Sequence, residues 1–255
     1  MSIAPSGCLL PRAAILGRLF AVIASLAASQ ALALEFSEAV IGGQKATVCR
    51  VNVKTDKLQL FLRDERGVPL KSFEGIERSL AVRGQKLVFG MNGGMYHGDL
   101  SPVGLYIENG RQLAPLNLAS GEGNFFLKPN GVFYVSASGA HVVEASAFAK
   151  VSERVTLATQ SGPMLVINGK LHPAFNPRSE SRLARNGVGV ASPETAIFVI
   201  VREPVNFHDF ASFFRDTLKC PNALFFDGTV SSLHAPALKQ SDKLIDLGPI
   251  LGVVE

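Results

Sequence analysis

From residue 34 onward, short apolar segments alternate with Gly, Pro and Asn. Six segments rich in Val, Leu, Ile and Phe are bounded by turn residues, and they span residues 47–53, 57–63, 86–91, 103–108, 124–128 and 131–136. Runs of this length and composition are typical of β-strands. The sequence therefore predicts an α+β fold, in a single β-rich domain with a mixed sheet and a few packed helices.

Two tight turns are also predicted. Pro129-Asn130-Gly131 stands between two of the expected strands, and Asn168-Gly169 follows another apolar segment at residues 163–167. Asn and Gly readily adopt the backbone conformations that tight turns need, and Asn-Gly favours a two-residue hairpin.

The segment at residues 195–201 is a continuous apolar run, which predicts a strand buried on both faces in the middle of a sheet. A helix is expected next, at residues 206–219, with Asn206 as its N-cap and Asp209 in its first turn. Its apolar side chains recur at helical spacing: Phe207, Phe210, Phe213, Phe214 and Leu218. This stripe predicts packing against the sheet, and a strand at 222–226 follows.

Residues 1–33 have the features of a secretory signal peptide. Arg12 and Arg18 precede a short apolar run at residues 19–28, and Ala31-Leu32-Ala33 offers a small-x-small cleavage site. An apolar run of about ten residues is well short of the roughly 20 that span a bilayer. We expect cleavage after Ala33, no stable membrane anchor afterwards, and a periplasmic or secreted protein.

Cleavage would leave residues 34–255, long enough for one large domain. It removes two arginines and no acidic residue, so the formal net charge falls from +4 to +2. No Lys/Arg stripe is present, and nucleic acid is not an expected partner. Cys49 and Cys220 remain, and a disulfide between them is predicted for an oxidising compartment, with two buried free thiols as the alternative.

Four polar segments punctuated by Gly each lie at the end of an apolar strand. They are Asn92-Gly93-Gly94-Met95-Tyr96-His97, Gln160-Ser161-Gly162-Pro163, Arg185-Asn186-Gly187-Val188-Gly189 and Asp227-Gly228-Thr229-Val230-Ser231-Ser232. Amide and hydroxyl groups bind sugar hydroxyls, Arg binds phosphate, and Gly lets the backbone approach an anion. Around one cavity this set would suit a sugar phosphate, although each segment alone also fits an ordinary turn, cap or salt bridge.

The order of these four segments resembles the phosphodiester glycosidase family, formerly a domain of unknown function, which includes the lysosomal uncovering enzyme. The resemblance spans about residues 45–250 and is closest to a bacterial exported subgroup. Two departures are Met95, inserted before the aromatic residue, and Thr229, where the family commonly has a second Gly. The resemblance implies a hydrolase that cleaves a sugar from a glycosyl phosphodiester, its carbohydrate substrate.

The chemistry of that reaction suggests a role for each residue. Arg185 would bind the phosphate, Asp227 would activate water or stabilise the cationic sugar, and His97 is a candidate acid or base. The substrate-binding candidates are Asn92, Gly93, Gly94, Tyr96, Gln160, Ser161, Gly162, Asn186, Gly228, Ser231 and Ser232. No cofactor or metal ligand set is assigned, and a divalent cation stays open.

Two other functions stay open. His97 with Asp99, His208 with Asp209, and Asp227 suggest a metal-dependent phosphoesterase, but no spacing matches a metal motif such as H-E-x-x-H. A non-catalytic carbohydrate-binding envelope protein on the same fold is the second. The sequence contains no G-x-S-x-G nucleophile elbow, Walker A loop or G-x-G-x-x-G fingerprint.

Overall fold

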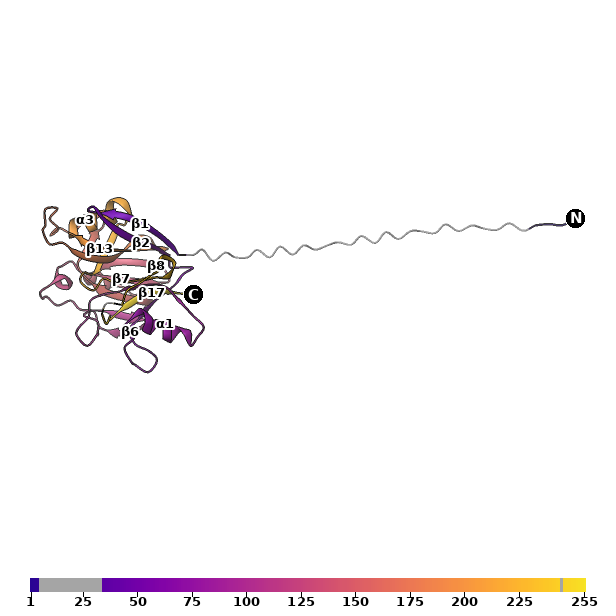
Figure 1. The fold of residues 1–255 in the computed structure, drawn as a ribbon, viewed down its shortest axis with the longest axis horizontal. Coiled ribbons are helices and arrows are strands. Elements are labelled where there is room, and N and C mark those ends of the chain that lie inside the picture. The colour runs from indigo at the N-terminus through magenta and orange to yellow at the C-terminus, as the bar shows by residue number, and fades with distance from the viewer. Residues whose placement is uncertain (5–33, 244) are drawn as a thin grey trace. The chain divides into compact units, whose positions relative to one another are not determined.

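The computed structural model describes residues 1–4, 34–243 and 245–255 (Figure 1). Residues Leu34–Glu255 form one compact unit. The predicted signal peptide lies outside the described residues apart from its first four. Within the described ranges, no helix is long and apolar enough to cross a membrane.

The unit is built on three antiparallel sheets. The first has seven strands in the order β1 (Glu35–Ile41), β2 (Gln44–Asn52), β13 (Thr195–Val205), β12 (Leu183–Ser192), β14 (Asn222–Asp227), β10 (Met164–Ile167) and β11 (Lys170–Leu171). The second has five, β16 (Gln240–Ser241), β15 (Leu233–Ala235), β4 (Leu87–Asn92), β17 (Ile250–Val254) and β3 (Lys57–Phe61). The third also has five, β6 (Arg111–Ala114), β5 (Tyr106–Glu108), β9 (Val155–Ser161), β7 (Gly131–Ser136) and β8 (Gly139–Glu144).

The prediction of a β-rich domain is confirmed, but the prediction of a mixed sheet is wrong. All pairings between the named strands are antiparallel. A parallel pair is usually joined by a crossover helix. The described residues contain only short helices, α1 (Phe73–Ala81), α2 (Ala145–Phe148) and α3 (Phe207–Ser212), besides single turns at Asn124–Phe126, Phe213–Thr217 and Pro236–Leu238.

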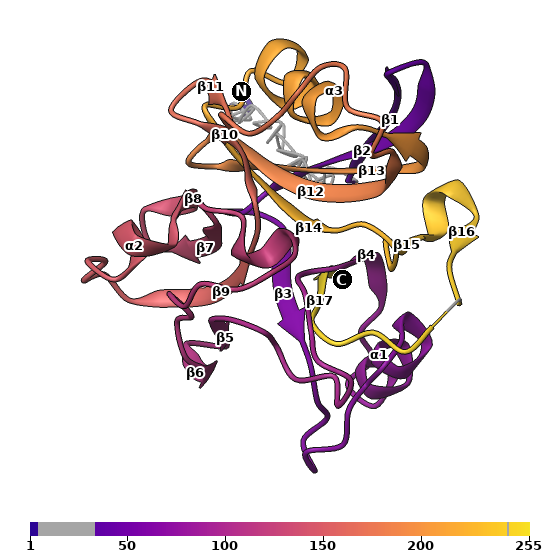
Figure 2. The same ribbon diagram turned by 90° about the vertical axis from the view of Figure 1, so that its left-hand side faces the viewer.

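Strand β13 lies inside the seven-stranded sheet and is buried on both faces, as its apolar run predicts. Ile197 and Val199 pack with the residues of α3, whereas Phe198 and Ile200 belong to the core shared with the other two sheets. Figure 2 shows the same layers, with α3 on one side of the sheet and β7, β4 and β17 on the other. One face of this sheet therefore packs against α3, and the other packs against the second and third sheets.

The predicted helix begins where expected. The side chain of Asn206 accepts a hydrogen bond from the N–H of Asp209 at 2.8 Å, which caps α3. Phe210 and Phe214 are fully buried against the sheet. The α-helix itself is shorter than predicted, because its second half is a π-helical turn at Phe213–Thr217.

Other predictions from local sequence patterns agree with the structure in some places and differ from it in others. Strand β7 has the predicted bounds, and Asn168-Gly169 forms the β10–β11 hairpin turn with positive φ angles of 48° and 79°. The strand predicted at 124–128 is wrong, because Asn124–Phe126 forms a 3₁₀ turn. Helix α1 was not predicted, although Ser72 caps it by accepting from the N–H of Gly75.

The predicted disulfide is wrong, since Cys49 and Cys220 are both free and buried. Cys49 lies in the core cluster that includes Phe198, whereas Cys220 lies in the cluster on the α3 side. A Cβ added at Gly189 would be 2.6 Å from Sγ of Cys220, and Gly189 pairs with Ile197, whose side chain also lies on the α3 side. The two thiols therefore lie on opposite faces of the seven-stranded sheet.

Candidate functional site

A hydrogen-bond network joins three of the four polar segments. Asn186 on β12 donates through Nδ2 to Oδ1 of Asn92 at 2.6 Å, and its own Oδ1 accepts from the N–H of Asp227 at 2.9 Å. Oδ1 of Asn92 also accepts from the N–H of Ser232 at 2.9 Å. Asn92 and Asn186 are both fully buried. The ends of β4 and β14 and the start of β15 therefore meet on β12.

The amide nitrogen of Asn92 is a free donor within this network. Its Nδ2 is buried and has no hydrogen-bond partner among the described residues. Oδ1 of the same side chain is occupied twice, so the orientation of the amide is fixed. A buried polar atom without a partner marks a position where a ligand or water oxygen would be stabilised.

Asp227 ends β14 beside this network. Burial raises the pKa of its carboxyl to about 6, although backbone N–H groups of Gly228 and Val230 act in the opposite direction. The N–H of Gly228 lies 2.6 Å from Oδ1, and no ion pair to Asp227 occurs within the described ranges. A carboxyl that titrates near neutral pH is suited to acid or base chemistry.

Tyr96 is the aromatic residue next to this carboxyl. Burial, followed by the negative charges of Asp227 and Asp246, raises the pKa of its phenol to about 12. Its hydroxyl donates to the backbone carbonyl of Asp246 at 2.9 Å. The phenol is therefore protonated at neutral pH and already anchored.

Several predicted binding residues hold the site together instead of lining it with free groups. Ser161 is buried and donates to the carbonyl of Phe226 at 2.8 Å, and Ser231 donates to the carbonyl of Asp227 at 3.1 Å. A Cβ at Gly162 would lie 2.6 Å from Cβ of Asn130. The bond from Ser161 joins β9 to β14 one residue before Asp227.

Gln160 is likewise committed to the backbone. Its Oε1 accepts from the N–H groups of Leu105 and Asn117, and its Nε2 donates to the carbonyl of Asn117 at 2.6 Å. The structure thus places Gln160 as a clamp on a neighbouring loop, with every polar atom of its amide occupied.

Thr159 is a residue that sequence reasoning missed. Its hydroxyl donates to the carbonyl of Gly93 at 2.6 Å. A Cβ added at Gly94 would lie 2.8 Å from Oγ1 of Thr159. Gly94 has a φ of 150°, which favours glycine. The Asn-Gly-Gly segment is therefore fixed by a threonine that lies 66 positions away.

The structure does not bring the Arg185 guanidinium to Asp227. Arg185 and Asn186 are consecutive on β12, so their side chains point to opposite faces of the sheet. Arg185 is fully buried on the α3 side, where its Nε donates to the carbonyl of Val205 at 2.8 Å and its Cζ lies 3.6 Å from the ring centroid of Phe207. The predicted arrangement of guanidinium opposite carboxylate is therefore absent from the described site.

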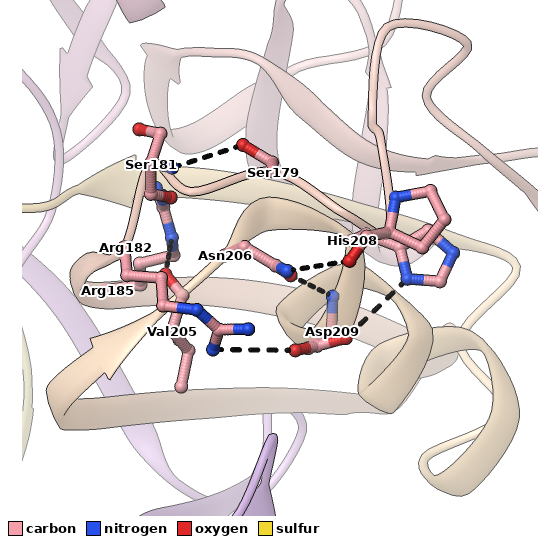
Figure 3. A network of polar contacts seen from close by, with 9 residues as sticks. Ser179, Ser181, Arg182, Arg185, Val205, Asn206, His208 and Asp209 are labelled. Carbon is pink, nitrogen blue, oxygen red and sulfur yellow. Dashed lines mark hydrogen bonds and ion pairs between the residues drawn. The ribbon is translucent and has the colours of Figure 1, made fainter.

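Burial lowers the pKa of Arg185 to about 10, so the side chain stays charged at neutral pH. One guanidinium nitrogen, NH2, donates to the carbonyl of Ser181 at 3.2 Å, while NH1 has no partner among the described residues. Figure 3 shows the surrounding network, in which Asp209 lies between Arg182 and His208. Oδ2 of Asp209 lies 3.9 Å from a guanidinium nitrogen of Arg182, and Oδ1 lies 3.6 Å from Nδ1 of His208.

The histidines are not gathered at the network. His97 is exposed in a hairpin, where its backbone N–H donates to the carbonyl of Ser101. His208 lies beside Asp209 in α3. In the part of the chain that the structure describes, no group of three His, Cys, Asp or Glu side chains is arranged to hold a metal ion. A surface hollow of about 530 Å³ beside α1 is lined by residues such as Asp64 and Arg83, and by none of the predicted site residues.

Comparison with known proteins connects this site to a family. The sequence model described as phosphodiester glycosidase matches residues 85–240, which include all four polar segments. The chain belongs to the phosphodiester glycosidase family. This membership confirms the resemblance of the four segments and supports a hydrolase of glycosidase type.

The chain is also similar to individual proteins. It is 39% identical over 184 residues to the uncharacterized protein YigE of Escherichia coli K12, covering 72% of each chain. The catalytic domain of zebrafish N-acetylglucosamine-1-phosphodiester alpha-N-acetylglucosaminidase, auto-inhibited by its pro-peptide, has the same fold, with a TM-score of 0.60 at 14% identity. That match covers 88% of this chain and 84% of the zebrafish chain. A hypothetical protein from Synechocystis matches with a TM-score of 0.51 at 12% identity, over 87% of this chain and 61% of that chain.

Proposed function

We propose that the chain is an exported phosphodiester glycosidase that hydrolyses the bond between C1 of a sugar and the oxygen of a phosphodiester. The observation that carries this proposal is the network of Asn92, Asn186 and Asp227. It places a carboxyl whose pKa is about 6 beside a buried amide donor that has no partner among the described residues. Family membership supports a reaction of glycosidase type.

The leaving group determines which catalytic groups are needed. A common glycosidase needs a carboxylic acid to protonate a poor leaving group. Here the group that departs is a phosphate ester, whose anion is stable at neutral pH. Catalysis therefore depends on activating water and stabilising charge, and one carboxylate can serve.

Each residue of the network has a role in this reaction. The carboxylate of Asp227 takes a proton from water while the water oxygen bonds to C1. The bond from C1 to the phosphate oxygen breaks, and its electron pair leaves with the phosphate. Nδ2 of Asn92 donates to an oxygen of the substrate, and Asn186 holds Asn92 and the backbone of Asp227 in register. Arg185 supports β12 and α3 from the opposite face, and His97, exposed on its hairpin, is given no step.

Hydrolysis of an aryl phosphodiester of a sugar in ¹⁸O-labelled water tests the proposal. Cleavage between carbon and oxygen puts the label in the sugar and leaves the phosphate product unlabelled, and mass spectrometry distinguishes the two. Unlabelled phosphate ester with free sugar is the expected result. Labelled phosphate with loss of turnover in a chelator would instead identify a metal-dependent phosphoesterase, the second function that the sequence left open.

A third outcome is binding without turnover. If several sugar phosphodiesters bind, as measured by calorimetry, and none is hydrolysed, the chain is a carbohydrate-binding envelope protein on the same fold. Thr229 would then be the first residue to replace by Gly, because the family commonly has Gly there. Hydrolysis by the Thr229→Gly variant alone would assign the loss of activity to this position.

Export is part of the proposal and has a separate test. The positively charged start, the short apolar run and the small-x-small site all lie within residues 1–33. Intact-mass measurement of the protein recovered from the periplasm or medium is expected to give a chain that begins at Leu34. Recovery of the full-length chain from the cytoplasm would contradict export.

A further inference from the structure

Tyr96 is held by a short backbone segment that follows β16. Its hydroxyl donates to the carbonyl of Asp246 at 2.9 Å. The carboxylate of Asp246 pairs with Nζ of Lys71 at 2.9 Å, and the N–H of Leu247 donates to the carbonyl of Lys71 at 2.7 Å. The segment is thus tied to the loop before α1, and the hydroxyl proton of Tyr96 is used in anchoring the ring.

Gly248 lies directly against Tyr96. A Cβ added at residue 248 would be 2.5 Å from Cγ of Tyr96, 2.6 Å from its Cβ and 2.9 Å from the carbonyl oxygen of Leu100. Separations below 3.0 Å force a neighbour to move. Gly248 has no positive φ, so glycine is required here for space and not for backbone conformation.

The ring so held lies beside the candidate site, because the N–H of Gly93, next to Asn92, donates to the carbonyl of Pro249, next to Gly248, at 2.8 Å. After burial, the charge of Asp227 is the largest contribution that raises the pKa of Tyr96, ahead of Asp246. The phenol cannot act as a nucleophile at neutral pH, since it stays protonated. Its hydroxyl already has the Asp246 carbonyl as acceptor. The part of Tyr96 that remains for a substrate is the ring.

We propose that Gly248 is a positioning residue, which lets the segment Asp246–Gly248 set the ring of Tyr96 as a wall of the sugar position beside Asp227. The assignment rests on the proposed function. Tyr96 presents its ring to the sugar, and its hydroxyl serves as the anchor. A side chain at position 248 moves the ring away from its place and misaligns the sugar relative to the carboxylate.

Turnover of four variants separates the ring from the hydroxyl. Gly248→Ala is expected to lower kcat by about 10- to 100-fold with less than about threefold change in KM, because a displacement near 1 Å can cost about 100-fold. Tyr96→Leu, which removes the ring, loses about 100-fold, whereas Tyr96→Phe loses only about two- to fivefold because the ring stays. Gly98→Ala is the matched control, since an added Cβ meets nothing within 4 Å there.

A second readout does not depend on activity. The chain has three tyrosines, Tyr96, Tyr106 and Tyr134. In protein labelled with ¹³C at tyrosine Cζ, the Tyr96 signal is assigned as the one missing from Tyr96→Phe. Gly248→Ala is expected to shift this signal and leave the other two in place, and Gly98→Ala is expected to shift none of them.

A double variant guards against simple misfolding. If Ala at position 248 acts through Tyr96, its effects on kcat and on Tm shrink in the Tyr96→Gly background, because that change removes both Tyr96 atoms that the added Cβ would meet. Equal kcat and an unmoved Tyr96 signal in Gly248→Ala would overturn the inference while the wild type remains active. An inactive wild type would instead contradict the proposed function. A Tyr96 signal that is shifted in Gly248→Ala would then still show the contact between residues 248 and 96.

Discussion

Nδ2 of Asn186 lies 2.6 Å from Oδ1 of Asn92, although 94 positions separate the two residues. Through this bond and the one from Asp227 N–H to Asn186, β12 holds the ends of β4 and β14 together. The central strands of a rigid sheet thereby set the position of the carboxyl. The candidate site depends on this buried amide pair more than on any surface loop.

Asn186→Ala is expected to destabilise the fold and abolish activity. The change leaves the N–H of Asp227 without its acceptor and removes a donor from Oδ1 of Asn92 in a buried place. Unfolding free energy should fall by about 2–4 kcal/mol, as measured by urea denaturation. Asn222→Ala, which removes an exposed acceptor for the N–H of Asn168, is the control and should cost less than about 1 kcal/mol. Equal losses in the two variants would refute the special role of Asn186.

Asp227→Asn is expected to make the protein more stable at neutral pH. Because the folded-state pKa is about 6, above the usual 3.8, the folded protein favours the protonated form and loses stability as pH rises from about 4 to about 6. The loss is on the order of 3 kcal/mol. Thermal unfolding should therefore favour the variant at pH 7.5 and show no difference below about pH 4. Asp216→Asn is the control of opposite sign, since Arg215 lowers the pKa of Asp216.

Arg185→Lys separates support of the fold from phosphate binding. Lysine cannot reproduce the bond from Nε to Val205 together with the stacking on Phe207, so unfolding free energy should fall by about 2–3 kcal/mol. KM of the folded variant should change less than about threefold, because binding of the phosphate is not its role. Arg66→Lys, at an exposed position, should change neither quantity. An unchanged stability with a KM raised about 100-fold would show that the guanidinium contacts the phosphate after all.

The two thiols should stay unpaired after export. Burial raises the pKa of Cys220 to about 12, and burial with nearby acidic residues raises that of Cys49 further. Ellman titration of the denatured, exported protein is expected to find both thiols, and native protein should react slowly. A reductant should leave Tm unchanged. Absence of free thiols, together with a Tm that reductant lowers, would show that Cys49 and Cys220 form a disulfide after all.

The sequence was informative where local chemistry decides the structure. The cap at Asn206, the turn at Asn168-Gly169 and the bounds of β7 follow from side chains that act within a few residues. Helix α1 could have been found the same way, because Ser72 precedes Phe73, Ile76 and Leu80 at helical spacing. The expected mixed sheet had no local basis, since pairing direction is a property of distant segments.

The site was predictable in its members and not in its geometry. Apolar runs that end in polar, Gly-rich segments indicated Asn92 and Asp227, whereas Asn186 lies inside β12 and not at the end of an apolar strand as expected. Recognition of β12 as a strand would have placed Arg185 and Asn186 on opposite faces, because side chains alternate along a strand. No local signal pointed to Thr159, whose bond to Gly93 spans 66 positions.

Whether Asp227 activates the attacking water is decided by the pH dependence of kcat/KM, measured for wild type and Asp227→Asn on an aryl phosphodiester of a sugar. We expect an ascending limb with an apparent pKa of about 6 in the wild type, since kcat/KM reports the free enzyme. In Asp227→Asn the limb should vanish and kcat should fall by about 100- to 10,000-fold, while the Asn92 and Asn186 contacts keep the protein folded. A variant that retains wild-type turnover with the same ascending limb would show that Asp227 is not the group that activates water.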